Sequence, residues 1–122
     1  MPLHRVMLFV KDLDRMAAFY RDVLGLQPVA ETRLDDWVEF SGNGSRFALH
    51  AIPPAIAAGV QIESPPRARE QSATKLTFDV PDVAGTLARI EAMGLPLLRR
   101  PWGDTEAVDP EGNVFGLRPA DA

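Results

Sequence analysis

The fold is decided by residues 8–26, LFVKDLDRMAAFYRDVLGL, which place a strand end, a helix cap and a helix end in one short run. Asp12 has the residue type and place of a helix N-cap, and apolar residues recur after it at helical spacing up to Leu24. Gly25 is the residue type that most often ends a helix. The run therefore predicts a strand from Leu3 to Val10 that is followed by an amphipathic helix.

The same pattern returns about seventy residues later in residues 78–95, FDVPDVAGTLARIEAMGL, with Asp82 as the cap and Gly94 as the end. After each helix the sequence becomes β-prone, so the repeated unit is strand–helix–three strands. Two such units must bury two apolar sheet faces. We therefore expect an α+β fold in which two βαβββ modules form concave sheets around a cleft, where a ligand can sit.

Each half also contains a predicted β-hairpin. The first joins Trp37–Ser41 to Arg46–Ile52 through Gly42-Asn43-Gly44-Ser45, and the second joins Thr105–Val108 to Val114–Arg118 through a turn at residues 109–113. We expect one domain over residues 1–122, with module one at about 3–52, a linker at about 53–73 and module two at about 74–119. The linker has room for one short helical turn and is long enough to cover the cleft.

Composition narrows the classes of partner. The formal charge of −4 and the lack of a Lys/Arg run beside aromatic residues argue against nucleic acid and anionic membranes. No apolar stretch reaches the roughly 20 residues of a membrane-spanning helix, and Met1-Pro2-Leu3-His4 lacks the order of a signal peptide. The chain has no cysteine, so disulfide and thiolate chemistry are excluded and a cytoplasmic location is expected.

Four sequence blocks resemble the vicinal-oxygen-chelate superfamily, which includes glyoxalase I, bleomycin resistance proteins and extradiol dioxygenases. They are Phe9-Val10-Lys11-Asp12-Leu13, Phe19-Tyr20-Arg21-Asp22-Val23-Leu24-Gly25-Leu26, Phe78-Asp79-Val80-Pro81-Asp82 and Asp109-Pro110-Glu111-Gly112-Asn113. The likeness covers nearly the whole chain. It implies a homodimer, and in the family's enzymes a divalent metal held by four His, Glu or Gln side chains from the first and fourth strands of both modules.

In this sequence the four places that the resemblance assigns to metal ligands are Arg5, Ala48, Lys75 and Gly116. None of these side chains is a usual ligand, and arginine cannot lose its proton to become one. His4, with His50 and Glu39, would make a zinc or iron set, but strand alternation points His4 to the other face. We therefore expect neither a metal nor another cofactor.

Strand alternation assigns a set of residues to the cleft face, where they are candidates for ligand binding. Pairing the first hairpin through its turn predicts Glu39 opposite Ala48 and Trp37 opposite His50. The residues of this face are Arg5, Met7, Trp37, Glu39, Ala48 and His50 in the first module, and Lys75, Thr77, Glu106, Val108, Val114, Gly116 and Arg118 in the second. Arg5 and Lys75 would clamp a ligand carboxylate or phosphate, or else pair internally with Glu39 and Glu106. Trp37 would stack a planar ligand or fill space, and Trp102 is expected to anchor its loop.

Three functional hypotheses follow. The first is a metal-free protein that binds a small, planar or anionic molecule, as the bleomycin resistance branch of the family does. The second is a divalent-metal-dependent lyase, isomerase or dioxygenase of the same superfamily, since the family's chemistry polarises oxygens on a metal ion. The third is a metal-free catalyst in which His50 and Glu39 act as base and acid. The sequence leaves all three hypotheses open, and it does not decide whether any reaction is catalysed.

Overall fold

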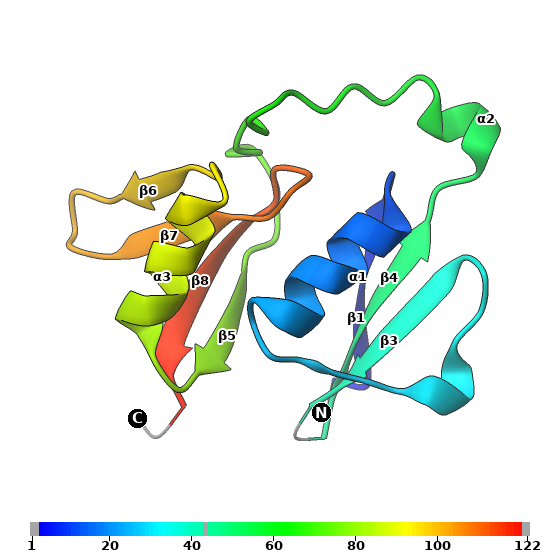
Figure 1. Ribbon diagram of the computed structural model, residues 1–122, viewed down its shortest axis with the longest axis horizontal. Coiled ribbons are helices and arrows are strands. Elements are labelled where there is room, and N and C mark those ends of the chain that lie inside the picture. The colour runs from blue at the N-terminus through cyan, green and yellow to red at the C-terminus, as the bar shows by residue number, and fades with distance from the viewer. Residues whose placement is uncertain (1–2, 43, 121–122) are drawn as a thin grey trace. The chain divides into compact units, whose positions relative to one another are not determined.

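The computed structural model describes residues 3–42 and 44–120, so that Asn43 of the predicted first turn lies outside the described residues. The chain divides into two compact units, one up to Gln61 and one from Ile62, and the division falls inside the predicted linker (Figure 1). The first unit contains β1 (Arg5–Val10), α1 (Leu13–Asp22), β2 (Gln27–Pro28), the 3₁₀ turn η1 (Ala30–Thr32), β3 (Trp37–Ser41), β4 (Arg46–Ala51) and α2 (Pro54–Ala57). The second contains β5 (Leu76–Val80), α3 (Val83–Ala92), β6 (Leu97–Arg99), β7 (Thr105–Val108) and β8 (Val114–Pro119).

Both units have the same sheet topology. The strand order is β1-β4-β3-β2 in the first and β5-β8-β7-β6 in the second. The first strand of each unit runs parallel to the last, and the other neighbours are antiparallel. The βαβββ repeat predicted from the sequence is therefore confirmed. Two strands begin later than predicted, β1 at Arg5 and β5 at Leu76, so that Lys75 immediately precedes its strand.

The two main helices begin and end as their sequences predict. Asp12 Oδ1 accepts from the backbone N–H of Arg15 at 3.2 Å, and Asp82 Oδ1 accepts from that of Gly85 at 3.0 Å. Gly25 and Gly94 have φ of 74° and 82°, values that glycine adopts without steric cost. The chain therefore turns out of each helix within one turn and enters the next strand. No helix of the described residues is both long and apolar enough to cross a membrane.

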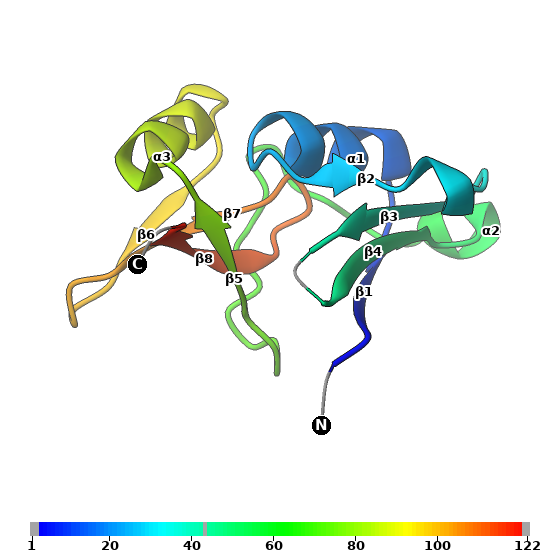
Figure 2. The same ribbon diagram turned by 90° about the horizontal axis from the view of Figure 1, so that it is seen from below.

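Helices α1 and α3 each cover one face of their own sheet (Figure 2). In the first unit Met16 and Tyr20 of α1 are at most 1% exposed, and the Tyr20 ring meets Phe47 of β4 edge-on at 4.9 Å between centroids. In the second unit Ile90 of α3 and Phe115 of β8 are at most 1% exposed. Because side chains alternate along a strand, the neighbours of Phe47 and Phe115 point to the opposite face of their sheets. That opposite face carries the predicted site residues.

Candidate functional site

The face of the first sheet turned away from α1 carries the predicted residues of the first module. In the β3–β4 hairpin, Glu39 lies opposite Ala48, as strand alternation predicted. Strand β1 runs parallel to β4 and aligns Arg5 with Arg46. Paired residues project to the same side of a sheet, so the register brings one set of side chains together. The predicted residues on this face are Arg5, Met7, Trp37, Glu39, Ala48 and His50.

Glu39 lies between two guanidinium groups. Its side chain is 5% exposed, and its Oε2 is 4.0 Å from Arg5 Nη1 and 3.7 Å from Arg46 Nη1. Its Oε1 accepts a hydrogen bond from Trp37 Nε1 at 3.3 Å. Both cation distances exceed hydrogen-bonding length, and the two arginine side chains are 40% and 39% exposed. The ion pair between Arg5 and Glu39 is therefore present but loose, and this group of three side chains keeps one surplus positive charge.

Aromatic rings lie on the same face beside this charged group. The guanidinium carbon of Arg5 is 4.9 Å from the centroid of the Trp37 ring, which is a cation–π distance. The His50 ring is 5.7 Å from Trp37 and also 5.7 Å from Phe9. His50 Nε2 is 3.4 Å from Asp36 Oδ2. His50 thus has Asp36 as an acidic neighbour, whereas the acid–base hypothesis paired it with Glu39.

An open groove of about 850 Å³ borders His50. It is lined by the end of β1, the start of α1, the loop before β3, the end of β4 and α2. The lining includes Phe9, which is 62% exposed, and the carboxylates of Asp35 and Asp36. The first unit therefore offers a cationic region around Arg5 and a more acidic, partly aromatic region around His50.

The face of the second sheet turned away from α3 repeats the arrangement. Thr77 is aligned with Gly116, and Asp79 with Arg118, between the parallel strands β5 and β8. Strands β7 and β8 pair Val108 with Val114. The same register places Glu106, two residues before Val108, on this face. The predicted residues of the second module on this face are Thr77, Glu106, Val108, Val114, Gly116 and Arg118.

The charges of the second face are more tightly paired than those of the first. Lys75 Nζ donates to Glu106 Oε2 at 2.8 Å, and Arg100 Nε donates to Glu106 Oε1 at 2.7 Å. Arg100 also donates from Nη1 and Nη2 to the two carboxylate oxygens of Glu70, at 2.9 Å and 2.7 Å. Arg118 is paired with Asp79 at 2.9 Å. The internal pairing of Lys75 with Glu106, one of the two alternatives from the sequence, is therefore present, and two residues that the sequence analysis did not select complete it.

These contacts shift the acidity of the groups involved. Burial raises the pKa of Glu106, but hydrogen bonds from Lys75 and Arg100 outweigh burial and hold the pKa below its ordinary value of 4.5. The Arg100 hydrogen bonds lower the pKa of Glu70 as well. The Arg118 hydrogen bonds do the same to the pKa of Asp79. At neutral pH these carboxylates are ionised, so they act as acceptors and charges rather than as proton donors.

Four residues of these charged groups were missed by the sequence analysis. Arg46 lies on the same strand as Ala48 and two residues before it, so strand alternation could have found it. Asp36 precedes β3 and Arg100 follows β6, where alternation no longer fixes a direction. Glu70 belongs to the predicted linker, whose sequence has no periodicity that could have placed it. Trp102, predicted to anchor its loop, is 65% exposed and lies under the guanidinium of Arg100 at 5.7 Å.

The residues present do not fit the family's metal centre. Arg5 and Lys75 bring positive charge to two of the four places predicted from the resemblance to hold its ligands, and Ala48 offers no donor atom at the third. At the fourth, a Cβ on Gly116 would already lie 3.2 Å from Thr77 Oγ1, so a longer side chain would need Thr77 to move. Within residues 3–42 and 44–120, no group of three or more His, Asp or Glu side chains could hold a metal ion.

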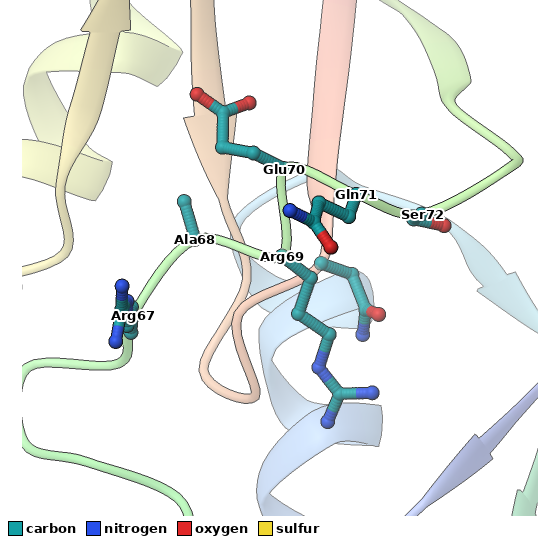
Figure 3. Close-up of a pocket in the computed structure, with 7 residues that line it drawn as sticks. Arg67, Ala68, Arg69, Glu70, Gln71 and Ser72 are labelled. Carbon is teal, nitrogen blue, oxygen red and sulfur yellow. The ribbon is translucent and has the colours of Figure 1, made fainter.

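The segment of residues 67–72, part of the predicted linker, is fixed to the turn at 109–113 of its own unit. The backbone N–H of Arg69 donates to Gly112 O at 2.8 Å, and Arg69 Nε donates to Glu111 O at 3.0 Å. Gly112 has φ of 93°, and a Cβ there would collide with the carbonyl oxygen of Arg67. Figure 3 shows the cavity of about 650 Å³ lined by this segment and Asn113, with the side chains of Arg69 and Glu70 pointing in opposite directions.

Comparison with known proteins finds a family whose sequence model matches nearly the whole chain. The sequence model of the Glyoxalase/Bleomycin resistance protein/Dioxygenase superfamily matches residues 3–117. YetH, an uncharacterised protein of Bacillus subtilis (strain 168), is 25% identical over 121 residues, and the match covers 93% of each chain.

Solved structures share the fold. A lactoylglutathione lyase from Agrobacterium tumefaciens is 28% identical, with a TM-score of 0.60 over 93% of this chain and 90% of its own. TnmS3, an antibiotic binding protein from Streptomyces sp. CB03234, is 21% identical, with a TM-score of 0.62 over 96% of this chain and 93% of its own. The likeness to TnmS3 is a likeness of fold alone.

Proposed function

This chain belongs to the glyoxalase/bleomycin resistance protein/dioxygenase superfamily, and from that premise we propose that it is a metal-free protein that binds a small, planar molecule with an acidic group. The ligand's acidic group lies against Arg5 and Arg46, and its planar part lies near Trp37. The protein holds this ligand without chemistry. Membership of the family is compatible with this role, because a fold does not determine the reaction that its members perform.

The observation that carries the proposal is the surplus positive charge beside Glu39. Two guanidinium groups share one carboxylate at 3.7 Å and 4.0 Å, and each is about 40% exposed. Guanidinium groups have five N–H donors in a fixed fork that matches a carboxylate or a phosphate. The sheet register places the two arginines side by side, and their donors lack a close acceptor on Glu39, which favours an anionic ligand. The adjacent Trp37 ring favours a planar one.

The alternative is a divalent-metal-dependent lyase, isomerase or dioxygenase, and it draws on the relative named as a lactoylglutathione lyase. An enzyme of that kind needs a Lewis-acidic ion to polarise the oxygens of its substrate. The residues at the ligand places of this chain argue against such an ion, because Arg5 and Lys75 repel a cation and Ala48 and Gly116 have no donor. Metal content therefore separates the two functions.

A screen for thermal stabilisation tests the proposal, using aromatic carboxylic acids and the neutral amide of each acid. A ligand present at one hundred times its dissociation constant stabilises the folded protein by about 2.7 kcal/mol. We expect saturable stabilisation by some acids and none by their amides. The stabilisation should weaken as salt is added, because part of the attraction is coulombic. Equal stabilisation by acids and amides would contradict the proposal.

Substitution of Arg5 by Met locates the site. The change keeps much of the bulk and removes the fork, so calorimetry should show acidic ligands binding about 1.5–3 kcal/mol more weakly, the usual value of a hydrogen bond to a charged group. Arg99→Met is the matched control, since Arg99 is a 70%-exposed arginine whose Nη2 lies 3.9 Å from Glu91. An equal loss in both variants would mean that only the net charge matters.

A further inference from the structure

The two units build the same charged group, but the second unit adds a carboxylate to it. In each, a glutamate that is less than 10% exposed lies between two basic side chains: Glu39 in the first unit and Glu106 in the second. Two cations around one carboxylate leave one surplus positive charge. In the second unit Glu70 neutralises that surplus.

The contact between Glu70 and Arg100 has the geometry of a ligand held by an arginine. Nη1 and Nη2 of Arg100 donate to the two oxygens of Glu70 at 2.9 Å and 2.7 Å, which is a bidentate fork. The Arg100 side chain is only 16% exposed, and Glu106 fixes its Nε at 2.7 Å. The fork is therefore held in place independently of Glu70.

Glu70 itself is not part of the sheet. It belongs to the segment of residues 67–72, and its side chain is 51% exposed. Figure 3 shows its side chain extending to the side opposite that of Arg69. A carboxylate that belongs to the same chain competes with free ligands through its effective concentration, and here the segment that carries it is bonded to Gly112 of the same unit. A carboxylate ligand that binds Arg100 must displace this tethered group.

We propose that Arg100 and Lys75 form a second anion-binding site, for a small carboxylate, and that Glu70 occupies this site in the structure. Arg100 supplies the fork, whose two N–H groups donate to both carboxylate oxygens. Lys75 supplies a further positive charge, and it is held near Arg100 because both side chains contact Glu106, at 2.8 Å and 2.7 Å. The exposed Trp102 ring beside Arg100 favours a ligand with an apolar body. The proposal concerns the second unit alone and does not depend on the function proposed for the first.

Benzoate is a suitable probe, with benzamide as its uncharged counterpart. Calorimetric titrations compare the unmodified protein, Glu70→Ala and the control Glu91→Ala, which removes a 62%-exposed carboxylate that lies 3.9 Å from Arg99. Apparent affinity falls in proportion to the fraction of protein whose site is free. If Glu70 fills the site nine-tenths of the time, Glu70→Ala should bind benzoate at this site about tenfold more tightly. Benzamide should show no gain.

A second variant tests whether the gain in benzoate affinity requires the guanidinium group of Arg100. In the Glu70→Ala background, Arg100→Lys keeps a positive charge for Glu106 but removes the two parallel donors. It should lose the gain, and its melting curve shows whether it is folded. Backbone amide resonances of Arg100 and Glu106, followed in the Glu70→Ala protein, report binding at this place even if the double variant is unstable.

The outcomes separate the two proposals. No gain in Glu70→Ala, an equal gain in Glu91→Ala, or a gain with benzamide would overturn the second site. A gain that survives Arg100→Lys in a folded protein would also overturn it. If the unmodified protein binds no benzoate while Glu70→Ala binds it through Arg100, the second site stands and benzoate gives no support to the first-unit site. If Arg5→Met abolishes binding in every variant, the first-unit site stands alone.

Discussion

Replacement of Glu39 by Gln removes the carboxylate that two arginines share and keeps the shape of the side chain. At separations of 3.7 Å and 4.0 Å and an effective dielectric constant of about 20, each pair has an attraction of about 4 kcal/mol. Because each arginine side chain is about 40% exposed, solvent reduces the contribution of each pair to about 1 kcal/mol. We therefore expect the free energy of unfolding to fall by about 2 kcal/mol.

The same substitution should have the opposite effect on ligand binding. With residue 39 neutral, Arg5 and Arg46 face an acidic ligand without an internal competitor, and we expect affinity to rise by about tenfold, or 1.4 kcal/mol. If Glu39 were instead a catalytic acid or a metal ligand, its loss would lower activity or metal content. The two directions of change distinguish a charge-balancing residue from a chemical one.

Urea unfolding, followed by tryptophan fluorescence, measures the first effect, and calorimetry with an acidic ligand measures the second. Glu91→Gln is the control, because it removes one carboxylate that is 62% exposed and lies 3.9 Å from Arg99. A Glu39→Gln protein that is as stable as the unmodified one and binds acids more weakly would refute the reasoning. A change in the urea slope between variants would mean that the unfolding is no longer comparable.

Further predictions concern metal, assembly, the 67–72 segment and pH. Elemental analysis after dialysis should find no stoichiometric divalent ion, and one tightly held zinc, nickel, iron or manganese per chain would contradict both the ligand assignment and the proposed function. Sedimentation at tens of micromolar should show a homodimer, since each sheet has edge strands that a second copy can cover, and a monomer would contradict this. Gly112→Ala should destabilise the protein by about 1–3 kcal/mol and speed hydrogen exchange at Arg69, more than Gly103→Ala does, because a Cβ at Gly103 meets no atom within 4 Å although both glycines have positive φ. The Arg100 contact lowers the pKa of Glu70, so the stability difference between the unmodified protein and Glu70→Ala should be fully present above the ordinary value of 4.5 and should disappear as pH falls through the lowered pKa; a difference that persists at low pH would contradict an ionic contact.

The sequence predicted which residues share a sheet face, because that follows from the two-residue period of a strand. Alternation along β3 and β4 placed Glu39 opposite Ala48 and Trp37 opposite His50, and both pairings are present. It also placed Thr77 and Gly116 on one face of the second sheet, where they are aligned. Which residues of two paired strands face each other depends only on the register, and the turn sets the register of a hairpin. Both could be inferred from the hairpin sequences.

The sequence did not predict contacts made by residues that lie outside the regular strands. Arg100 lies just beyond β6, so its direction follows from the turn that joins β6 to β7, where its N–H bonds Asp104 O at 2.7 Å. Glu70 reaches Arg100 from a segment that the hydrogen bond between Arg69 and Gly112 joins to the same unit. Neither contact has a local sequence pattern. Long-range contacts of this kind depend on the folded unit as a whole. The sequence therefore offered the pairing of Lys75 with Glu106 as one alternative but did not include Arg100 and Glu70.

Glu39 and Glu106 have the same place in the two sheets, but only one of the two cations around each comes from an equivalent place. Arg5 and Lys75 precede or begin the first strand of their unit, whereas Arg46 begins β4 and Arg100 follows β6. A buried carboxylate is costly unless it is paired, and any basic side chain within reach can meet that need. The strand register therefore fixes the glutamates, while the cations need only be near.

Because the cations differ between the units, the basic side chains and not the glutamates determine which acidic ligands bind. A ligand carboxylate cannot bind the glutamates, which repel it, so it must match the position and donor geometry of the basic side chains. In the first unit those are Arg5 and Arg46, about 40% exposed. Removal of Glu39 should therefore change how tightly acids bind but not their order of preference, whereas Arg5→Met should change the order. A panel of acids with different spacings between the carboxylate and the ring, titrated against both variants, tests this. If the order changes equally in both, Glu39 contacts the ligand directly and this reasoning about the arginines is wrong.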